Sequence, residues 1–228
     1  MPSTKRFVVT IDGPAGVGKS TVAKLLARRL KLLYLDTGAT YRTLAYAALK
    51  ANLNPITDAK RVAALGRRLP VRLRQDSSLG LRVFLGGEEV TTRIRTEEVT
   101  EAAAQVSQEP AVRAAMVALQ RRLANHQSVV VEGRDTGSVV FPRASYKFFL
   151  DANATVRARR RQRELAELYG TKPPITQVSE QLHFRDHLDR NRRVGPLIKP
   201  KGAVTIDTTR LTIPQVIRAI LRHITRVS

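Results

Sequence analysis

The sequence predicts an α/β fold in which a mainly parallel β-sheet lies between layers of helices. Short, almost continuous apolar runs, such as Val129, Val130 and Val131, are typical of parallel strands that are covered on both faces. These runs alternate with segments whose apolar residues recur at helical spacing. A glycine-rich turn at residues 13–20 joins the first strand to the first helix, which is the context of a phosphate-binding loop (P-loop).

The elements expected before residue 70 follow from apolar spacing and from turn residues. They are a strand at 7–11, the P-loop helix from 21 to about 30, a strand at 32–35 with a loop at 36–38, a helix with Leu44, Ala47 and Ala48, and a helix with Val62, Leu65 and Leu69. The run Asn-Leu-Asn-Pro at 52–55 separates the last two helices.

Between about residues 70 and 95 the apolar period changes from the helical value to two. Leu81, Val83 and Leu85 alternate with polar or charged neighbours, and Gly86 and Gly87 punctuate the run. The pattern predicts a small antiparallel sheet inserted into the α/β chain. We expect this insert to cover a substrate; a purely structural flap is the alternative.

In addition to the helices that carry Arg157 and Arg185, three helices and three strands are expected after residue 95. The strands lie at 129–131, 146–150 and 204–206, and the helices begin at Thr96, at Pro110 and at the capping box of Thr212 and Gln215. Strands that alternate with helices in this way favour parallel pairing in the central sheet.

Length and composition indicate one compact unit rather than several domains joined by linkers. The chain has 228 residues, 43% of them hydrophobic, and no apolar run long enough to span a bilayer. The first core strand begins almost at once after Met1, which leaves no room for a signal peptide. Because the chain has no cysteine, it has no disulfide framework, and we expect a cytoplasmic protein without membrane association.

The formal net charge is +21, from 40 Lys and Arg against 19 Asp and Glu. Nucleic acid, a site crowded with nucleotide phosphates, and a solvated basic surface are the three explanations. Aromatic residues make up only 5% of the chain, and no pair of them follows the pattern of a base-stacking sheet. We therefore expect no obligatory nucleic-acid partner.

The P-loop segment predicts a nucleoside triphosphate and a metal together. Backbone N–H groups of such a loop surround a polyphosphate, and the helix N-terminus adds its partial positive charge. Lys19 is placed to neutralise the β- and γ-phosphates, and Ser20 to bind Mg²⁺ through its hydroxyl. The expected nucleotide-binding residues are Gly13, Pro14, Ala15, Gly16, Val17, Gly18, Lys19, Ser20 and Thr21.

A second group of charged residues follows a predicted core strand. The run Glu132, Gly133, Arg134, Asp135 lies at the carboxyl edge, where open parallel sheets bind ligands, and is therefore expected to face the P-loop. A strand-ending turn with a local ion pair is the alternative.

Two arginine-rich segments further along the chain suit phosphate chemistry. Arg185, Asp189 and Arg192 stand at i, i+4 and i+7, so one helix face is expected to carry all three and to bind a phosphate and a ribose hydroxyl. Arg157, Arg160 and Arg161 share another predicted helix face, where cations meet the charge that develops during phosphoryl transfer. Exposed helices with i,i+4 ion pairs or solvated charges are the alternatives.

Five segments, in this order and at these separations, resemble the bacterial cytidylate kinase family: GPAGVGKS, LDTGATYR, TEEVTEAAAQVSQEPAVR, VVEGRDTGSVVFP and RDHLDRNRR. The resemblance implies a P-loop core (1–36 and 109–228), a lid at about 153–175, and a monophosphate-binding region (37–108) with the antiparallel insert. It also implies transfer of a phosphoryl group from ATP to CMP or dCMP, with Mg²⁺ and a monomeric enzyme.

The resemblance further implies roles for single residues. The residues that match those holding the acceptor phosphate are Thr37, Arg42, Arg134 and Arg192. The pair that reads cytosine is matched by Arg113 and Asp135, and the ribose-side pair by Arg185 and Asp189. The lid arginines are matched by Arg157 and Arg161. The expected catalytic set is Lys19, Arg134, Arg157, Arg161 and Arg192. No carboxylate is assigned as a general base, because the acceptor is already an oxyanion at neutral pH.

One position departs from the family pattern. Ala104 stands where the family usually has a serine near the base, so that contact is absent or is supplied by Ser107, Thr100 or water. A kinase of UMP, AMP or a non-nucleotide remains an alternative on the same core. A regulatory GTPase would need an Asn-Lys-x-Asp motif, which the chain lacks, and an RNA-binding module would leave Lys19 and Ser20 without a purpose.

Overall fold

The structure is a computed structural model that describes residues 6–76, 80–124 and 127–225. Residues 1–5, on which the expectation about a signal peptide partly rests, lie outside the described residues, as do residues 77–79 of the predicted insert. None of the helices in these described ranges is long and apolar enough to cross a membrane.

Five parallel strands form the central sheet, as the apolar runs predict. They are β1 (Val8–Asp12), β2 (Leu33–Asp36), β6 (Val129–Gly133), β7 (Tyr146–Asp151) and β8 (Val204–Asp207). Their order across the sheet is β2-β6-β1-β7-β8, with every neighbouring pair parallel. All residues of β6 are buried, which explains why this strand reads as an unbroken apolar run before its acidic end.

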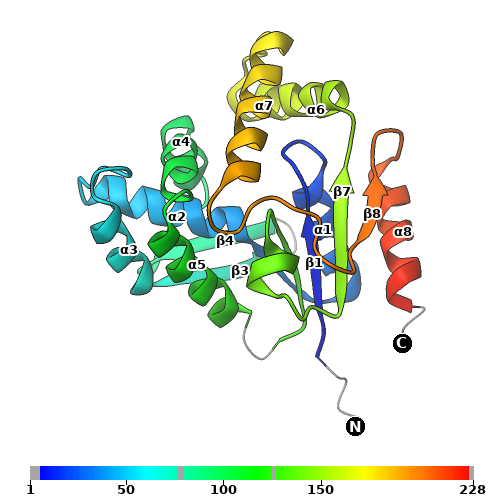
Figure 1. The fold of residues 1–228 in the computed structure, drawn as a ribbon, viewed down its shortest axis with the longest axis horizontal. Helices are drawn as coiled ribbons and strands as arrows, with labels where there is room; N and C mark the ends of the chain where they lie inside the picture. Colours follow the sequence, from blue (N-terminus) through cyan, green and yellow to red (C-terminus); the bar gives the residue numbers. More distant parts are fainter. Residues whose placement is uncertain (1–5, 77–79, 125–126, 226–228) are drawn as a thin grey trace.

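The register of the sheet brings polar strand ends to one edge. Asp12 at the end of β1 lies beside Gly133, and Asp36 at the end of β2 lies beside Glu132. Because all five strands are parallel, their carboxyl ends share this edge, where the P-loop also starts (Figure 1).

Two helices that are far apart in sequence pack together beside the sheet. Helix α1 (Lys19–Leu30) contacts β6, β2 and β1, and helix α8 (Ile213–Thr225) packs on α1. Half of the expected capping box is present: the Thr212 N–H donates to Gln215 Oε1 at 2.7 Å, and the Thr212 hydroxyl contacts the same oxygen at 3.0 Å. A π-helical turn, η2 (Thr136–Val140), contacts β1 and was not foreseen from the sequence.

Four helices lie on the other flank of the molecule, in the left half of Figure 1. They are α2 (Thr37–Lys50), α3 (Ala59–Arg67), α4 (Glu97–Val106) and α5 (Pro110–Leu123), with the short 3₁₀ turn η1 (Arg93–Arg95) before α4. The expected loop at 36–38 is wrong: Asp36 caps α2 directly by accepting a hydrogen bond from Ala39 N at 2.9 Å. Leu69 is buried but lies beyond the end of α3, so the helical spacing overran the helix by two residues.

The antiparallel insert is present. It consists of β3 (Val71–Asp76), β4 (Gly80–Leu85) and the short β5 (Glu88–Glu89), in the order β3-β4-β5. Gln75 Oε1 accepts a hydrogen bond from the Tyr34 N–H at 3.2 Å, so the insert satisfies a backbone donor on the edge strand β2.

Helices α6 (Ala154–Tyr169) and α7 (Ile175–Asn191) stand above the carboxyl edge of the sheet (Figure 1). Helix α7 ends at Asn191, so Arg192 lies just past the helix rather than on the expected helix face. The division into a core, a monophosphate-binding region and a lid with the boundaries given above stays a prediction.

Candidate active site

The P-loop lies between β1 and α1 and curls around a lysine of its own. Gly16 and Gly18 have φ values of +79° and +91°, in the left-handed region that glycine adopts most readily. Lys19 is 5% exposed, and its Nζ donates a hydrogen bond to the Pro14 carbonyl at 2.7 Å. The ammonium group therefore lies within the loop, beside the N-terminus of α1.

The electrostatic surroundings of Lys19 disfavour its own positive charge. Burial, and after it the nearby Arg134 guanidinium, lower the pKa of Lys19 from 10.5 to about 7, while Glu132 and Asp189 act in the opposite direction. Cations from the P-loop and from the end of β6 thus lie close enough to repel one another. A polyanion placed between them would relieve this repulsion.

The Ser20 hydroxyl is held by an acidic residue at the end of β6. It donates to Glu132 Oε1 at 2.7 Å, and the Tyr34 hydroxyl contacts the same oxygen at 3.3 Å. Burial and then the charge of Asp36 raise the pKa of Glu132. No group of three or more His, Cys, Asp and Glu within the described ranges could hold a metal by itself. A Mg²⁺ ion bound mainly through nucleotide phosphates needs only one or two protein oxygens, which Ser20 and Glu132 fit.

Asp189 gathers two of the predicted phosphate-binding arginines. Its Oδ2 accepts from Arg134 Nε at 2.8 Å, and its Oδ1 lies 3.4 Å from Arg192 Nη1. Although burial opposes ionisation of Asp189, the guanidiniums of Arg134, Arg192 and Arg185 lower its pKa. Burial and then Arg134 lower the pKa of Arg185 to about 10. The four residues therefore form one interacting cluster beside Lys19.

Thr37 and Arg42 lie in the first turns of α2, next to the end of β6. The Thr37 hydroxyl donates to the Glu132 carbonyl at 2.8 Å, and Arg42 Nη2 pairs with Asp36 Oδ2 at 2.9 Å. A Cβ atom on Gly133 would lie 2.4 Å from Thr37 Oγ1, so only glycine allows this approach. Thr37 and Arg42 are thereby held beside the Arg134 cluster.

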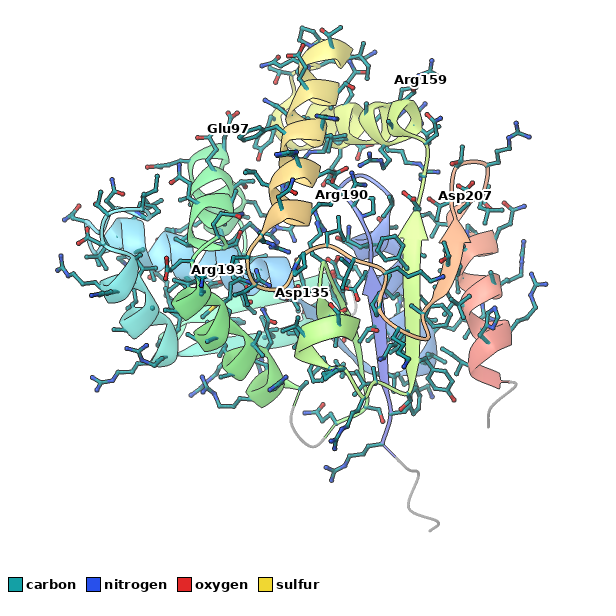
Figure 2. All side chains as sticks on the ribbon, in the orientation of Figure 1. Glu97, Asp135, Arg159, Arg190, Arg193 and Asp207 are labelled. Atoms are coloured by element: carbon teal, nitrogen blue, oxygen red, sulfur yellow. The ribbon has the colours of Figure 1, made fainter. Side chains whose placement is uncertain are left out.

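A buried ion pair joins α5 to the loop after β6. Arg113, 1% exposed, pairs with Asp135, and its Nη1 also donates to the Ser107 carbonyl at 3.2 Å. The guanidinium lies 5.6 Å from the centroid of the Tyr41 ring. The Ser107 hydroxyl donates to the Ala104 carbonyl at 2.8 Å. Asp135 lies near the middle of the molecule, as Figure 2 shows.

The arginines of α6 do not form the single cationic face that their spacing predicts. They have separate partners: Arg157 binds the Asp186 carboxylate and the Ala15 carbonyl, Arg160 the Thr208 carbonyl and hydroxyl, and Arg161 the Glu164 carboxylate. Arg157 is buried against the P-loop, whereas Arg161 retains more exposure and pairs with an exposed neighbour on its own helix. Spacing alone could not distinguish these environments.

Sequence reasoning missed Asp12, the last residue of β1. This fully buried carboxylate accepts hydrogen bonds from Thr136 N at 2.7 Å, Thr136 Oγ1 at 2.8 Å and Gly137 N at 2.7 Å. It therefore fixes the segment after Asp135 next to the P-loop. The sequence signal that could have identified Asp12 is an acidic residue placed between a core strand and Gly13. Asp186, which holds Arg157, was likewise given no role, whereas Glu132, which holds Ser20, was expected at this edge but without a role of its own.

Comparisons with known proteins agree on one family. The family model described as cytidylate kinase matches residues 9–226. A cytidylate kinase from Mycobacterium avium is 48% identical over 212 residues, covering 92% of this chain and 91% of that protein. A cytidylate kinase from Caldanaerobacter subterraneus subsp. tengcongensis is 43% identical over 216 residues, covering 95% of this chain and 93% of that protein.

A solved structure of an uncharacterized protein from Eubacterium ventriosum shares the fold, with a TM-score of 0.51 at 11% identity. The alignment covers 96% of this chain and 99% of the other. The family model, which matches nearly the whole chain, and the two relatives at 43% and 48% identity show that the chain belongs to the cytidylate kinase family.

Proposed function

We propose that this protein transfers the γ-phosphoryl group of ATP to CMP or dCMP, with Mg²⁺, and so produces ADP and CDP or dCDP. Membership of the cytidylate kinase family supports the reaction, and the P-loop and the Arg134 cluster supply the two phosphate sites that it needs. We also propose a cytoplasmic monomer that requires no nucleic acid.

One observation supports the assignment of the acceptor site. Six buried side-chain polar atoms in the described part of the chain have no hydrogen-bond partner, and four of them are arginine Nε atoms: those of Arg42, Arg113, Arg157 and Arg192. Arg42, Arg113 and Arg192 belong to the predicted acceptor site, and Arg157 belongs to the predicted lid. Buried guanidinium N–H groups without acceptors are costly, and the oxygens and base edge of a nucleotide provide the acceptors they lack.

On the donor side, the P-loop amides and Lys19 bind the triphosphate. The Ser20 hydroxyl, which Glu132 orients, is the protein oxygen that would bind Mg²⁺. The bound ion would neutralise charge on the β- and γ-phosphates. To meet the phosphates, the Lys19 ammonium must leave the Pro14 carbonyl. It then exchanges a neutral oxygen acceptor for a charged one.

In the transfer step, an oxygen of the CMP phosphate forms a bond to the γ-phosphorus as the bond to the bridging oxygen of ADP breaks. The electron pair of the broken bond stays with ADP, so no proton has to be removed from the acceptor. Arg134 and Arg192, which Asp189 holds together, offset the repulsion between the two polyanions. Catalysis is thus positioning and charge neutralisation.

The Arg113 and Asp135 pair favours cytosine over uracil. A carboxylate accepts from the exocyclic amine of cytosine, whereas the corresponding uracil oxygen would face the same carboxylate with no hydrogen between them. Ala104 supplies no hydroxyl at the position of the family serine; where neither Ser107, Thr100 nor water replaces that contact, base discrimination falls by about 1–3 kcal/mol.

A coupled assay of ADP release with Mg-ATP and each nucleoside monophosphate tests the proposal. We expect CMP and dCMP to give the highest kcat/KM, with UMP well below them and AMP and GMP near the rate without acceptor. Preference for UMP would favour the alternative kinase. ADP release that no monophosphate stimulates, together with salt-sensitive RNA binding, would favour an RNA-binding protein.

The distribution of basic residues does not favour that last alternative. In Figure 2 Arg159, on α6, lies apart from Arg190 and Arg193, which are three residues from each other at the end of α7, and basic side chains project from several helices. Such a scattered distribution is typical of solvated surface charge.

We expect ATP binding to weaken as the pH rises above about 7. In the free protein Lys19 loses its proton near this pH, whereas contact with phosphates returns its pKa toward the ordinary 10.5. Binding then takes up a proton, so the association constant should fall by up to about tenfold per pH unit above 7. Calorimetric titration at pH 7, 8 and 9, in buffers of different ionisation enthalpy, measures the slope and the proton uptake.

The control for this experiment is Lys19→Arg, whose guanidinium stays charged throughout the range. Its ATP affinity should be nearly independent of pH. A slope as steep as that of the unsubstituted protein would mean that another group titrates.

A further inference from the structure

The middle of the P-loop is held from outside by the two helices above the sheet. The Ala15 N–H donates to Asp186 Oδ1 of α7 at 3.2 Å, and the Ala15 carbonyl accepts from Arg157 Nη1 of α6 at 3.0 Å. Arg157 and Asp186 also pair with each other. Both polar groups of a single loop residue are therefore bound by one buried ion pair.

Packing makes this connection a close one. Asp186 is 2% exposed, and the Ala15 methyl lies in a small apolar cluster with Ala158, Val178 and Leu182. A Cβ atom on Gly16 would lie 2.9 Å from the Arg157 carbonyl oxygen. The backbone of α6 therefore touches the loop directly, and the first turns of α6 cannot move without the loop.

The orientation of the peptides around Ala15 affects how the loop receives phosphates. A P-loop binds a polyphosphate with N–H groups that already converge, because reorienting them on binding costs free energy. With its N–H directed to Asp186 and its carbonyl to Arg157, Ala15 cannot rotate either adjoining peptide freely. If Asp186 lost its charge, Arg157 would be buried without a counter-ion and both restraints would weaken.

Helix α7 also carries residues of the acceptor side. Asp186 lies one residue after Arg185 and three before Asp189, the carboxylate that holds Arg134 and Arg192. The helix thus connects the donor loop at one carboxylate to the acceptor arginines at the next. A ligand that orders one end of this segment should favour the conformation required at the other.

We propose that Asp186 is a positioning residue for the donor phosphates: through Ala15 and Arg157 it fixes the P-loop, and through α7 it couples ATP binding to CMP binding. This role rests on the proposed kinase function. Asp186 touches neither nucleotide. It acts through the loop amides and the Arg157 guanidinium.

The test is Asp186→Asn, which keeps the shape of the side chain but removes its charge. We expect the KM for ATP to rise about tenfold, as for the loss of a hydrogen bond to a charged group, with the Kd for CMP alone within twofold of normal. The tightening of ATP binding by CMP, measured by calorimetry with a non-hydrolysable ATP analogue, should largely disappear. A purely structural role would raise both constants together and lower the melting temperature.

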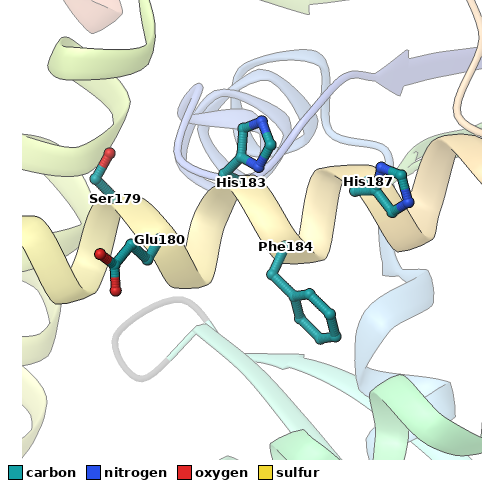
Figure 3. A pocket seen from close by; sticks show the side chains of 5 residues that line it. All are labelled: Ser179, Glu180, His183, Phe184 and His187. Carbon is teal, nitrogen blue, oxygen red and sulfur yellow. The ribbon is translucent and has the colours of Figure 1, made fainter.

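The matched control is Glu180→Gln, which removes the same charge from the same helix. Glu180 is exposed, and Figure 3 shows it on a shallow surface hollow with Ser179, His183, Phe184 and His187. This variant should keep both constants. Arg157→Gln should raise the ATP KM by a similar factor, and the double variant with Asp186→Asn should be no worse than either single one.

An ATP KM in Asp186→Asn equal to that of Glu180→Gln would overturn the inference, and so would parallel losses at both sites. If Asp186→Asn does not fold, amide hydrogen exchange decides the matter in the unsubstituted, nucleotide-free protein. Protection of the Ala15 N–H supports the inference, and exchange at the rate of an exposed amide refutes it. Failure of the proposed function would look different, because the unsubstituted protein itself would not phosphorylate CMP.

Discussion

Replacing Lys19 by methionine is expected to lower kcat for phosphoryl transfer by about a thousandfold. Lys19 lies inside the P-loop curve, and a donor aimed at developing phosphate charge is worth about 3–4 kcal/mol in a site closed to water. Coupled ADP release with CMP and saturating Mg-ATP measures the loss. The KM for CMP should change little, because the Arg134 cluster does not depend on the Lys19 hydrogen bond.

The fold should survive this substitution. The ammonium of Lys19 is buried, and burial already lowers its pKa to about 7, so removing the charge relieves an unfavourable environment. The melting temperature should therefore stay the same or rise. Lys24→Met is the matched control, because Lys24 is exposed on the same helix. A Lys19→Met protein with normal turnover would end the assignment of the P-loop as the donor site.

The sequence predicts where strands and helices lie in the chain better than it predicts which of them lie side by side. Within the described residues, apolar period and turn residues predict every strand except the two-residue β5. They also indicate which strands are buried on both faces and which on one, because the apolar patterns of the two kinds differ. They do not predict the order β2-β6-β1-β7-β8, which depends on pairings such as Val8 with Val129. Val8 and Val129 lie more than a hundred positions apart in the chain.

The same limit applies to the site. The P-loop and the segment 132–135 are predicted because strand, turn and charge are adjacent in the chain. Asp12 and Asp186 are not, because their partners, Thr136 and Ala15, lie 124 and 171 residues away. Arg192 shows a smaller error of the same kind: it reaches Asp189 from beyond the helix end, although its spacing predicts a place on the helix.

Replacing Asp135 by asparagine is expected to change base preference more than any other single substitution. Its carboxylate pairs with Arg113, which is 1% exposed, and is the acceptor proposed for the cytosine amine. Asparagine can turn its amide N–H₂ toward the ligand, where it repels the amine of cytosine and meets the oxygen of uracil. The ratio of kcat/KM for CMP to that for UMP should therefore fall by about a hundredfold or more.

The donor site should be unaffected by Asp135→Asn, since ATP contacts are assigned to the P-loop. Asparagine leaves the Arg113 charge without a counter-ion, so some stability is lost, and the assays are best run well below the melting temperature. Asp207→Asn removes the same charge at an exposed strand end, far from Asp135 in Figure 2, and should leave the ratio unchanged. Equal losses of ATP and CMP affinity, or an unchanged CMP to UMP ratio, would show that Asp135 supports the fold without reading the base. In that case the discrimination would have to come from Ser107 and the ring of Tyr41, the other groups in contact with Arg113.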